Sequence, residues 1–140
     1  LMHEIKLPEK YAIPQLFGKV EWTVRGIWQE YVGWFDENPT TMYASPISDL
    51  YPDLADLAGE EKLLAKAREY FAKNEYVKVL QLTEIILRAH PMDQSAIEVR
   101  LDALNGLKAG TRNFIEKIWL NHAIRQCEEN LGLPAVKEAK

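Results

Sequence analysis

The stretch that decides the fold is Val20–Pro39, VEWTVRGIWQEYVGWFDENP, which holds three of the four tryptophans of this 140-residue chain. At 100° per residue one set of its apolar side chains forms a single stripe, typical of a core-facing helix, namely Val20, Val24, Ile27, Trp28, Tyr31 and Phe35. Trp22, Gly26 and Gly33 fall on the other side. Each glycine costs roughly 0.5–1 kcal/mol against alanine inside a helix, so two on one face indicate that another element packs closely there. We therefore expect a helix from about Gly18 to Phe35, buried on two sides, either centrally in the fold or against a partner.

Length and composition are those of one ordinary globular domain, with 47% hydrophobic and 27% charged residues. No apolar run approaches the roughly 20 residues of a membrane span. The net charge of −4 and the scattered lysines and arginines argue against a nucleic-acid partner. The N-terminus, LMHEIKLPEK, lacks the apolar region of a signal peptide, so the compartment stays open. A first residue other than methionine indicates a fragment of a longer protein.

The remaining patterns predict helices, because no stretch alternates apolar and polar residues between turn signals as a strand does. Asn38-Pro39 is expected to stop the first long helix. Ser45-Pro46 predicts a helix start, Pro52 a break or restart, and Gly59 an end. Four further helices are expected at Glu60–Lys73, Glu75–Ala89, Asp93–Lys108 and, with Thr111 as cap, Thr111–Asn130. The fold class is therefore all-α, a bundle of about six helices, preceded by an extended arm with a short helix.

The middle of the chain has the spacing of one tetratricopeptide-type unit. Tyr70 lies in the first helix of the pair, Asn74-Glu75-Tyr76 in the turn, and Pro91 after the second helix. Val79 stands where such repeats have a small residue. A single repeat cannot cover its own apolar face. This hairpin is therefore expected to pack on the first and last helices or on a second chain, and the pattern is not read as a peptide-binding groove.

Several motifs in the chain resemble those of one known domain. From Trp22 the chain reads Trp-x-Val-Arg-Gly-Ile, and residues 31–39 read Tyr-Val-Gly-Trp-Phe-Asp-x-Asn-Pro. Shorter motifs are Leu7-Pro8, Phe17-Gly18-Lys19-Val20, Leu57-Ala58-Gly59 and Arg112-Asn113. Over residues 7–131 the chain resembles the dimerisation domain of alkyl sulfatases, zinc-dependent hydrolases of the metallo-β-lactamase superfamily. Glu37 and Glu60 stand where that family has glycine, and both positions are expected at turns.

The resemblance implies a division of labour within a longer protein. Residues 1–17 would lead from an upstream catalytic domain, residues 18–131 would form the α-helical dimerisation domain, and residues 132–140 a C-terminal tail. The expected partners are a second copy of the chain and that metallo-β-lactamase-fold catalytic domain. Zinc, and the hydrolysis of alkyl sulfate esters to alcohol and sulfate, would belong to the catalytic domain. The fragment itself is expected to be non-catalytic and to hold no cofactor.

The residues agree with that expectation, because they contain no recognisable catalytic constellation. The three histidines, His3, His90 and His122, form no His-x-His-x-Asp-His run, which a metallo-β-lactamase site needs for its metals. His90 is expected to end a helix near its negative pole, and His122 to be partly buried with a hydrogen-bond partner. Cys127, the only cysteine, is expected to be buried and inert on an apolar stripe.

The candidate site residues cluster around the end of the tryptophan-rich helix. Asn38 is expected to hold the turn after it through its side chain. Arg25 is expected to pair with Asp36 or Glu21, or to stack on a ring. The resemblance implies that this turn and Trp34 lie at the junction with the catalytic domain. The full set of interface or junction candidates is Trp22, Arg25, Gly26, Gly33, Trp34, Phe35, Asp36, Asn38 and Pro39. Arg112-Asn113 is expected to anchor the start of the last helix.

Two other functions compete with a dimerisation domain. A stand-alone tetratricopeptide-like adaptor would bind a peptide, but it requires several repeats and a concave face of asparagine, lysine and arginine. The sequence supplies one repeat and no such face. A small independent enzyme would need a catalytic constellation, and the sequence offers neither Gly-x-Ser-x-Gly nor a phosphate-binding glycine loop.

Overall fold

The computed structural model describes Pro8, Lys10, residues 14–43 and residues 45–134. Across these residues the chain is all-α, as predicted, with six α-helices, two short 3₁₀ turns and no strand. In chain order the elements are α1 Val20–Val32, η2 Pro39–Met42, η3 Ile47–Leu50, α2 Tyr51–Ala58, α3 Glu60–Ala72, α4 Tyr76–Ala89, α5 Gln94–Gly110 and α6 Phe114–Asn130. His3, Leu7 and most of the predicted N-terminal segment (residues 1–17) and C-terminal tail (residues 132–140) lie outside the described residues.

Side-chain caps begin the two longest helices. The Asp93 side chain accepts a hydrogen bond from the Ala96 backbone N–H at 2.7 Å and so caps α5, as predicted. The cap of α6 is Asn113 and not Thr111, so that prediction was wrong by two residues. Thr111 lies two residues before Asn113, and its hydroxyl accepts a hydrogen bond from the Asn113 backbone N–H at 3.1 Å.

Proline and glycine divide the chain ahead of α3, with one difference from the prediction. Pro46 leads into the 3₁₀ turn η3 and not directly into an α-helix. The α-helix begins at Tyr51 with Pro52 in its first turn, the position where proline removes no needed N–H. Gly59 ends α2 at φ 83°, in the left-handed region that glycine adopts without steric cost.

Helices α3, α4, α5 and α6 pack in sequential order, each against the next, and α2 packs on α4. Two apolar clusters hold them together. One joins α5 and α6 through buried Ile97, Leu104, Ile124 and Cys127. The other joins α3, α4 and α5 through small or branched residues, Ala67, Val79 and Ala103. Half-buried Leu80 contacts both clusters, so the four helices form one continuous core.

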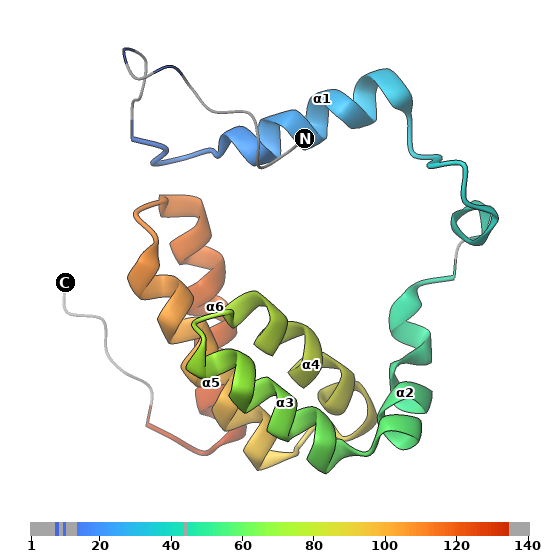
Figure 1. The fold of residues 1–140 in the computed structure, drawn as a ribbon. Helices are drawn as coiled ribbons and strands as arrows, with labels where there is room; N and C mark the ends of the chain where they lie inside the picture. Colours follow the sequence, from blue (N-terminus) through green and yellow to red (C-terminus); the bar gives the residue numbers. More distant parts are fainter. Residues whose placement is uncertain (1–7, 9, 11–13, 44, 135–140) are drawn as a thin grey trace.

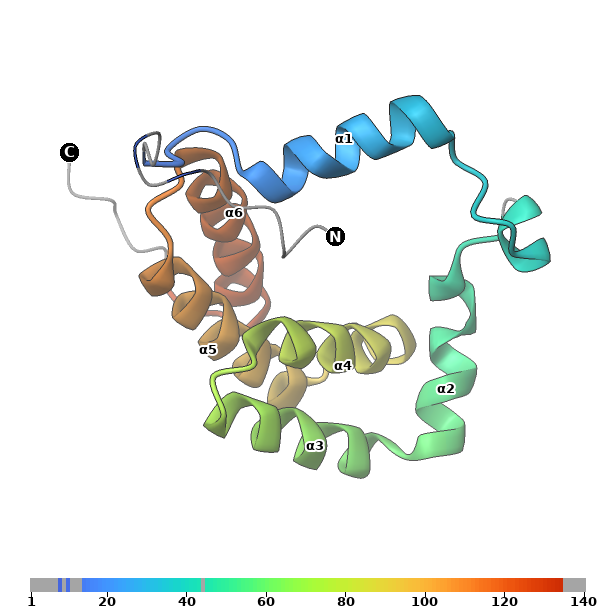
Figure 2. The same cartoon turned by 45° about the horizontal axis from the view of Figure 1, so that its top comes forward.

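Helix α1 stands apart from this core (Figures 1 and 2). Both views show it extending away from the start of α6, with η2 and the following segment leading around to α2. No residue of α1 is buried, and α1 is not among the helices that pack extensively on one another. The expectation of a helix at the centre of the fold is therefore wrong for the single chain, because the core is built without it.

Candidate association surface

About half of the large apolar side chains that are exposed among the described residues lie in one segment. We call residues 20–50 the arm; it comprises α1, η2, η3 and the segments between them. Of the 21 large hydrophobic side chains exposed among the described residues, 11 lie in the arm. They are Trp22, Ile27, Trp28, Tyr31, Val32, Trp34, Phe35, Met42, Tyr43, Ile47 and Leu50. Exposed apolar residues concentrated on one segment are typical of interaction sites.

The arm is acidic as well as apolar. It contains five acidic residues, Glu21, Glu30, Asp36, Glu37 and Asp49, and one basic residue, Arg25, which makes a net charge of −4. The whole chain also has a net charge of −4, so the rest of the chain is neutral overall. A surface that covers the arm must therefore pack against its aromatic side chains and accommodate its negative charge.

Along α1 the predicted stripe is open to solvent over most of its length. Val20 and Val24, near its start, are half-buried. Ile27 and Trp28 are 51% and 55% exposed, and Tyr31 is 85% exposed. The amphipathic pattern is real, but the second half of the stripe stays exposed among the residues that the structure describes.

Among the described residues, the two glycines of α1's other face have no close neighbour. A methyl group built at Gly26 or Gly33 would meet no atom within 4 Å. Gly33 adopts φ 81° and ψ −170°, a conformation that is essentially restricted to glycine. Its N–H donates to the Gln29 carbonyl at 3.0 Å, and α1 ends there, before Phe35 and before Asn38-Pro39. Glycine backbone geometry, and not proline, therefore terminates this helix.

The turn that follows is held by its own side chains. The Asp36 carboxylate accepts hydrogen bonds from the Thr41 hydroxyl and the Asn38 N–H, and in that order these bonds hold the pKa of Asp36 below its usual value. Asn38 accepts from the Thr40 N–H at 3.1 Å, as predicted, and Pro39 begins η2. Glu37 lies at φ 64°, in the left-handed region that glycine adopts most easily, which fits the glycine that the resemblance implies at this position.

The aromatic candidates lie in contact with their neighbours in the chain and remain open on the outside. Trp34 is 72% exposed and meets Phe35 edge to face, with 5.7 Å between ring centroids. Lys19, and not Arg25, lies over the Trp22 ring, 5.8 Å from its centroid. Across the described part of the chain Arg25 forms no ion pair with Asp36, whose partners are those of the turn. The nine candidates thus lie along one segment, in α1 and the turn after it.

One buried polar side chain joins the segment before α1 to the start of α6. Asn113 is only 2% exposed. Its Oδ1 accepts from the Glu116 N–H at 2.9 Å, and its Nδ2 donates to the carbonyls of Gln15 and Gly18 at 2.8 and 3.3 Å. The expected anchoring role of the Arg112-Asn113 pair is thereby confirmed for Asn113, which also holds a segment almost 100 residues away.

Further contacts reinforce this connection. The Phe114 N–H donates to the Leu16 carbonyl at 2.5 Å, and the rings of Phe17 and Phe114 lie 5.7 Å apart. The Lys19 ammonium lies 2.8 Å from the Glu116 carboxylate. We call this set the clasp; it comprises Gln15, Leu16, Phe17, Gly18, Lys19, Asn113, Phe114 and Glu116. Sequence reasoning missed its N-terminal half, because nothing local to residues 15–19 indicates a partner at residues 113–116.

The Glu116 carboxylate is the charged centre of the clasp. Burial alone would raise its pKa, but hydrogen bonds from Lys19 and Thr111, with the charge of Lys19, outweigh burial and hold the pKa of Glu116 below its usual value. The charged form is therefore the one that the clasp favours.

The histidines and the cysteine occupy structural positions. His90 caps the end of α4, as predicted, and its Nε2 lies 2.6 Å from a carboxylate oxygen of Glu60 at the start of α3. His122 is exposed, with its ring edge-on to Trp119, so the expectation of a partly buried histidine was wrong. Cys127 is buried as predicted, and burial raises the pKa of its thiol. Within the described ranges no three His, Cys, Asp or Glu side chains come together as metal ligands could.

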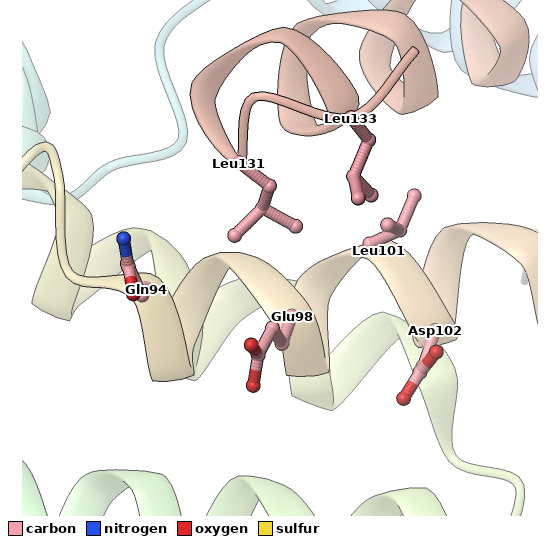
Figure 3. Close-up of a pocket in the computed structure, with 6 residues that line it drawn as sticks. All are labelled: Gln94, Glu98, Leu101, Asp102, Leu131 and Leu133. Atoms are coloured by element: carbon pink, nitrogen blue, oxygen red, sulfur yellow. The ribbon is translucent and has the colours of Figure 1, made fainter.

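A pocket of about 370 Å³ lies between α5 and the end of α6 (Figure 3). Its lining residues are Gln94, Glu98, Leu101, Asp102, Leu131 and Leu133. Figure 3 shows the leucines facing one another, whereas Glu98 and Asp102 extend from α5 away from them. The two carboxylates therefore do not converge on a shared reacting centre.

No helix in the part of the chain that the structure covers has the length and apolar character needed to cross a membrane.

Comparison with known proteins gives a consistent result. A family model described as alkyl sulfatase dimerisation matches residues 1–129. A linear primary-alkylsulfatase from Pseudomonas sp is 29% identical over 112 residues, covering 76% of this chain and 17% of that protein. An alkyl/aryl-sulfatase from Saccharomyces cerevisiae is 26% identical over 102 residues, covering 72% of this chain and 16% of that protein. An (R)-specific secondary-alkylsulfatase from Pseudomonas sp is 25% identical, with 86% and 19% covered.

The fold recurs in a solved structure. The stereoselective inverting sec-alkylsulfatase Pisa1 from Pseudomonas sp. matches with a TM-score of 0.78 and 22% identity, over 98% of this chain and 22% of that one. At this identity the likeness shows the fold alone. The chain spans about a fifth of the length of the relatives that it matches.

Proposed function

Since this chain belongs to the alkyl sulfatase dimerisation family, we propose that it is a non-catalytic homodimerisation module in which two copies pair through the apolar surface of the arm. The observation that carries the proposal is the concentration of exposed aromatic and aliphatic side chains on a segment that the core leaves uncovered. In a dimer with two-fold symmetry, both copies would contribute this same surface to the interface.

Burial of the exposed side chains of the arm would supply a free energy of the size that dimerisation needs. An aromatic residue of this size buries about 150–250 Å² when fully covered, and 55% of Trp28 is exposed. About 100 Å² therefore remains for a partner to cover, equivalent to about 2.5 kcal/mol per copy at about 25 cal/mol per Å². Several such side chains in each arm would offset the cost of association, and an obligate interface typically exceeds about 2,000 Å².

We propose that the domain acts within a longer hydrolase. In this proposal residues 1–17 lead from an upstream metallo-β-lactamase-fold domain, residues 18–131 form the dimerisation domain, and residues 132–140 form a tail. Hydrolysis of alkyl sulfate esters, and zinc, belong to the upstream domain; the described residues offer no set of zinc ligands. The turn of Asp36, Asn38 and Pro39, with exposed Trp34, is proposed to contact that domain, as the resemblance to alkyl sulfatases implies. Local hydrogen bonds hold this turn in shape.

The experiment that tests the proposal is sedimentation of the chain over a range of concentrations. We expect a dimer, and we expect Trp28→Ala to weaken it at least 100-fold, because about 5 kcal/mol of apolar burial is lost per symmetric dimer. Trp119→Ala is the matched control, since Trp119 is 67% exposed but lies on α6, off the arm. A monomer at all concentrations, or equal losses in both variants, would contradict the proposal.

A tetratricopeptide-like character of the α3–α4 hairpin is a further part of the proposal. The turn between the helices places Asn74 at φ 58°, and the Tyr76 hydroxyl lies 2.7 Å from the Asn74 side chain. Ala67 and Val79 meet in the buried cluster between the helices. The competing function, a peptide-binding adaptor, predicts a monomer that binds peptides, so the sedimentation experiment separates the two.

A further inference from the structure

The direction of α1 depends on contacts outside α1. None of its residues is buried and it does not pack extensively on another helix. Its C-terminal end leads into Gly33, whose backbone has φ 81° and ψ −170°, and then into a turn that is held by its own hydrogen bonds. Its N-terminal end, by contrast, begins directly at the clasp. The direction of α1 relative to the core is therefore set mainly at that end.

A continuous path of hydrogen bonds runs from the core to α1. Asn113 Nδ2 donates to the carbonyls of Gln15 and Gly18, which closes the segment between them onto the start of α6. Gln15 in turn accepts, through its side-chain Oε1, the N–H of Val20 at 2.7 Å. Val20 is the first residue of α1. The residue that Asn113 holds is thus the one that binds the first N–H of the helix, so a shift at Asn113 is passed on to α1 in two steps.

We infer that Asn113 is a positioning residue for self-association: its side-chain amide sets the direction in which α1 leaves the core and so presents the arm to a second copy. This inference rests on the proposed function. Asparagine suits the task because its oxygen caps α6 while its NH₂ group donates to two carbonyls. The two roles use different atoms and can therefore be separated by mutation.

The separating substitution is Asn113→Asp. Aspartate caps a helix as well as asparagine does, but as a carboxylate it has no N–H to donate to the carbonyls of Gln15 and Gly18. The cap of α6 is thus kept, while the two hydrogen bonds from Asn113 to the segment before α1 are lost. The matched control is Asn130→Asp, the same chemical change at the exposed end of α6. A second control, Asp93→Ala, removes the cap of α5 and lowers core stability without touching the clasp.

Two readouts on the full chain test the inference. Spin labels on cysteines at Gln29 of α1 and Gln81 of α4, both exposed, report the arm-to-core distance in a Cys127→Ala background diluted with unlabelled chain. Sedimentation reports the dimer dissociation constant. We expect Asn113→Asp to broaden the distance distribution and to weaken the dimer about tenfold or more, and we expect both controls to leave the distribution narrow.

The outcomes distinguish the two levels of argument. A narrow, unchanged distance distribution in Asn113→Asp would overturn the inference, and so would a broadened distribution with an unchanged dissociation constant. A wild-type chain that stays monomeric would overturn the proposed function, while the distance measurement would still show whether Asn113 positions α1. Loss of folding in Asn113→Asp would show as loss of helical circular dichroism; Asn113→Ser, which also caps α6 but cannot donate to both carbonyls, then gives the same reading.

Discussion

Gly106 of α5 lies directly against the Tyr76 ring of α4, and this contact predicts an unusual response to mutation. Alanine at a helical glycine ordinarily stabilises a protein by about 0.5–1 kcal/mol. At Gly106, however, an added methyl carbon would lie 2.5 Å from the Tyr76 ring of α4, well inside van der Waals contact. The Tyr76 ring would have to move, so the sign of the effect depends on what holds that ring.

Two contacts hold Tyr76. Its hydroxyl lies 2.7 Å from the Asn74 side chain, and its ring lies 5.6 Å from the Phe71 ring. Losing a hydrogen bond costs about 0.5–1.5 kcal/mol and losing an aromatic pair a similar amount. Their sum, about 2 kcal/mol, exceeds the gain in helix propensity of about 1 kcal/mol. We therefore expect Gly106→Ala to lower the free energy of unfolding by about 1 kcal/mol.

Urea unfolding followed by circular dichroism measures this value, and two further variants isolate its cause. Gly110→Ala, in the same helix but with no atom within 4 Å of the added methyl group, should be neutral or stabilising. In a Tyr76→Ala background, Gly106→Ala should recover its ordinary stabilising effect of about 0.5–1 kcal/mol. If Gly106→Ala stabilises the wild-type chain as much as Gly110→Ala does, the helices can separate freely and the reasoning is refuted.

Two other predictions concern the arm and the clasp. Gly26→Ala should raise the helix content of α1, because no described residue approaches that position. It should nevertheless weaken the dimer if the partner packs closely there. Sedimentation that shows an unchanged or tighter dimer would exclude such close packing. The clasp should also be pH-dependent: since the folded pKa of Glu116 is lowered from 4.5, the stability it contributes is present above about pH 4.5 and is lost as the pH falls through the folded value. Arm-to-core distances measured between pH 7 and pH 3 should broaden on acidification, and Glu116→Gln, already uncharged at neutral pH, should show a smaller pH response.

The helical pattern was largely readable in the sequence because it depends on neighbouring residues. Asp93 and Gly59 mark helix ends through atoms within four residues of themselves, so the prediction from their type was confirmed. The prediction for α1 ended too late because Gly33 was placed inside the helix as a close-packing residue, and Asn38-Pro39 was taken as the stop. Only the backbone angles at Gly33 show which of them ends the helix. Thr111 and Asn113 are both good caps, and the sequence could not choose between them.

The sequence by itself determined that the chain is helical, that its first long helix is amphipathic and rich in tryptophan, and that its motifs resemble one dimerisation family. These properties follow from periodicity and local composition, which need no knowledge of distant contacts. Only the tertiary structure decided that α1 lies outside the core and that its apolar stripe stays exposed. Periodicity reports that a face must be covered, but it carries no information about which chain covers it.

The clasp is the clearest case of a feature that tertiary structure alone decides. Asn113 and Gln15 are 98 residues apart, and neither belongs to a motif that names the other. They meet because packing of α3 to α6 brings the start of α6 back beside the segment that precedes α1, where a buried side-chain amide must find partners for its polar atoms. The placement of the arm is therefore a consequence of the folded core, although the residues of the arm were already conspicuous in the sequence.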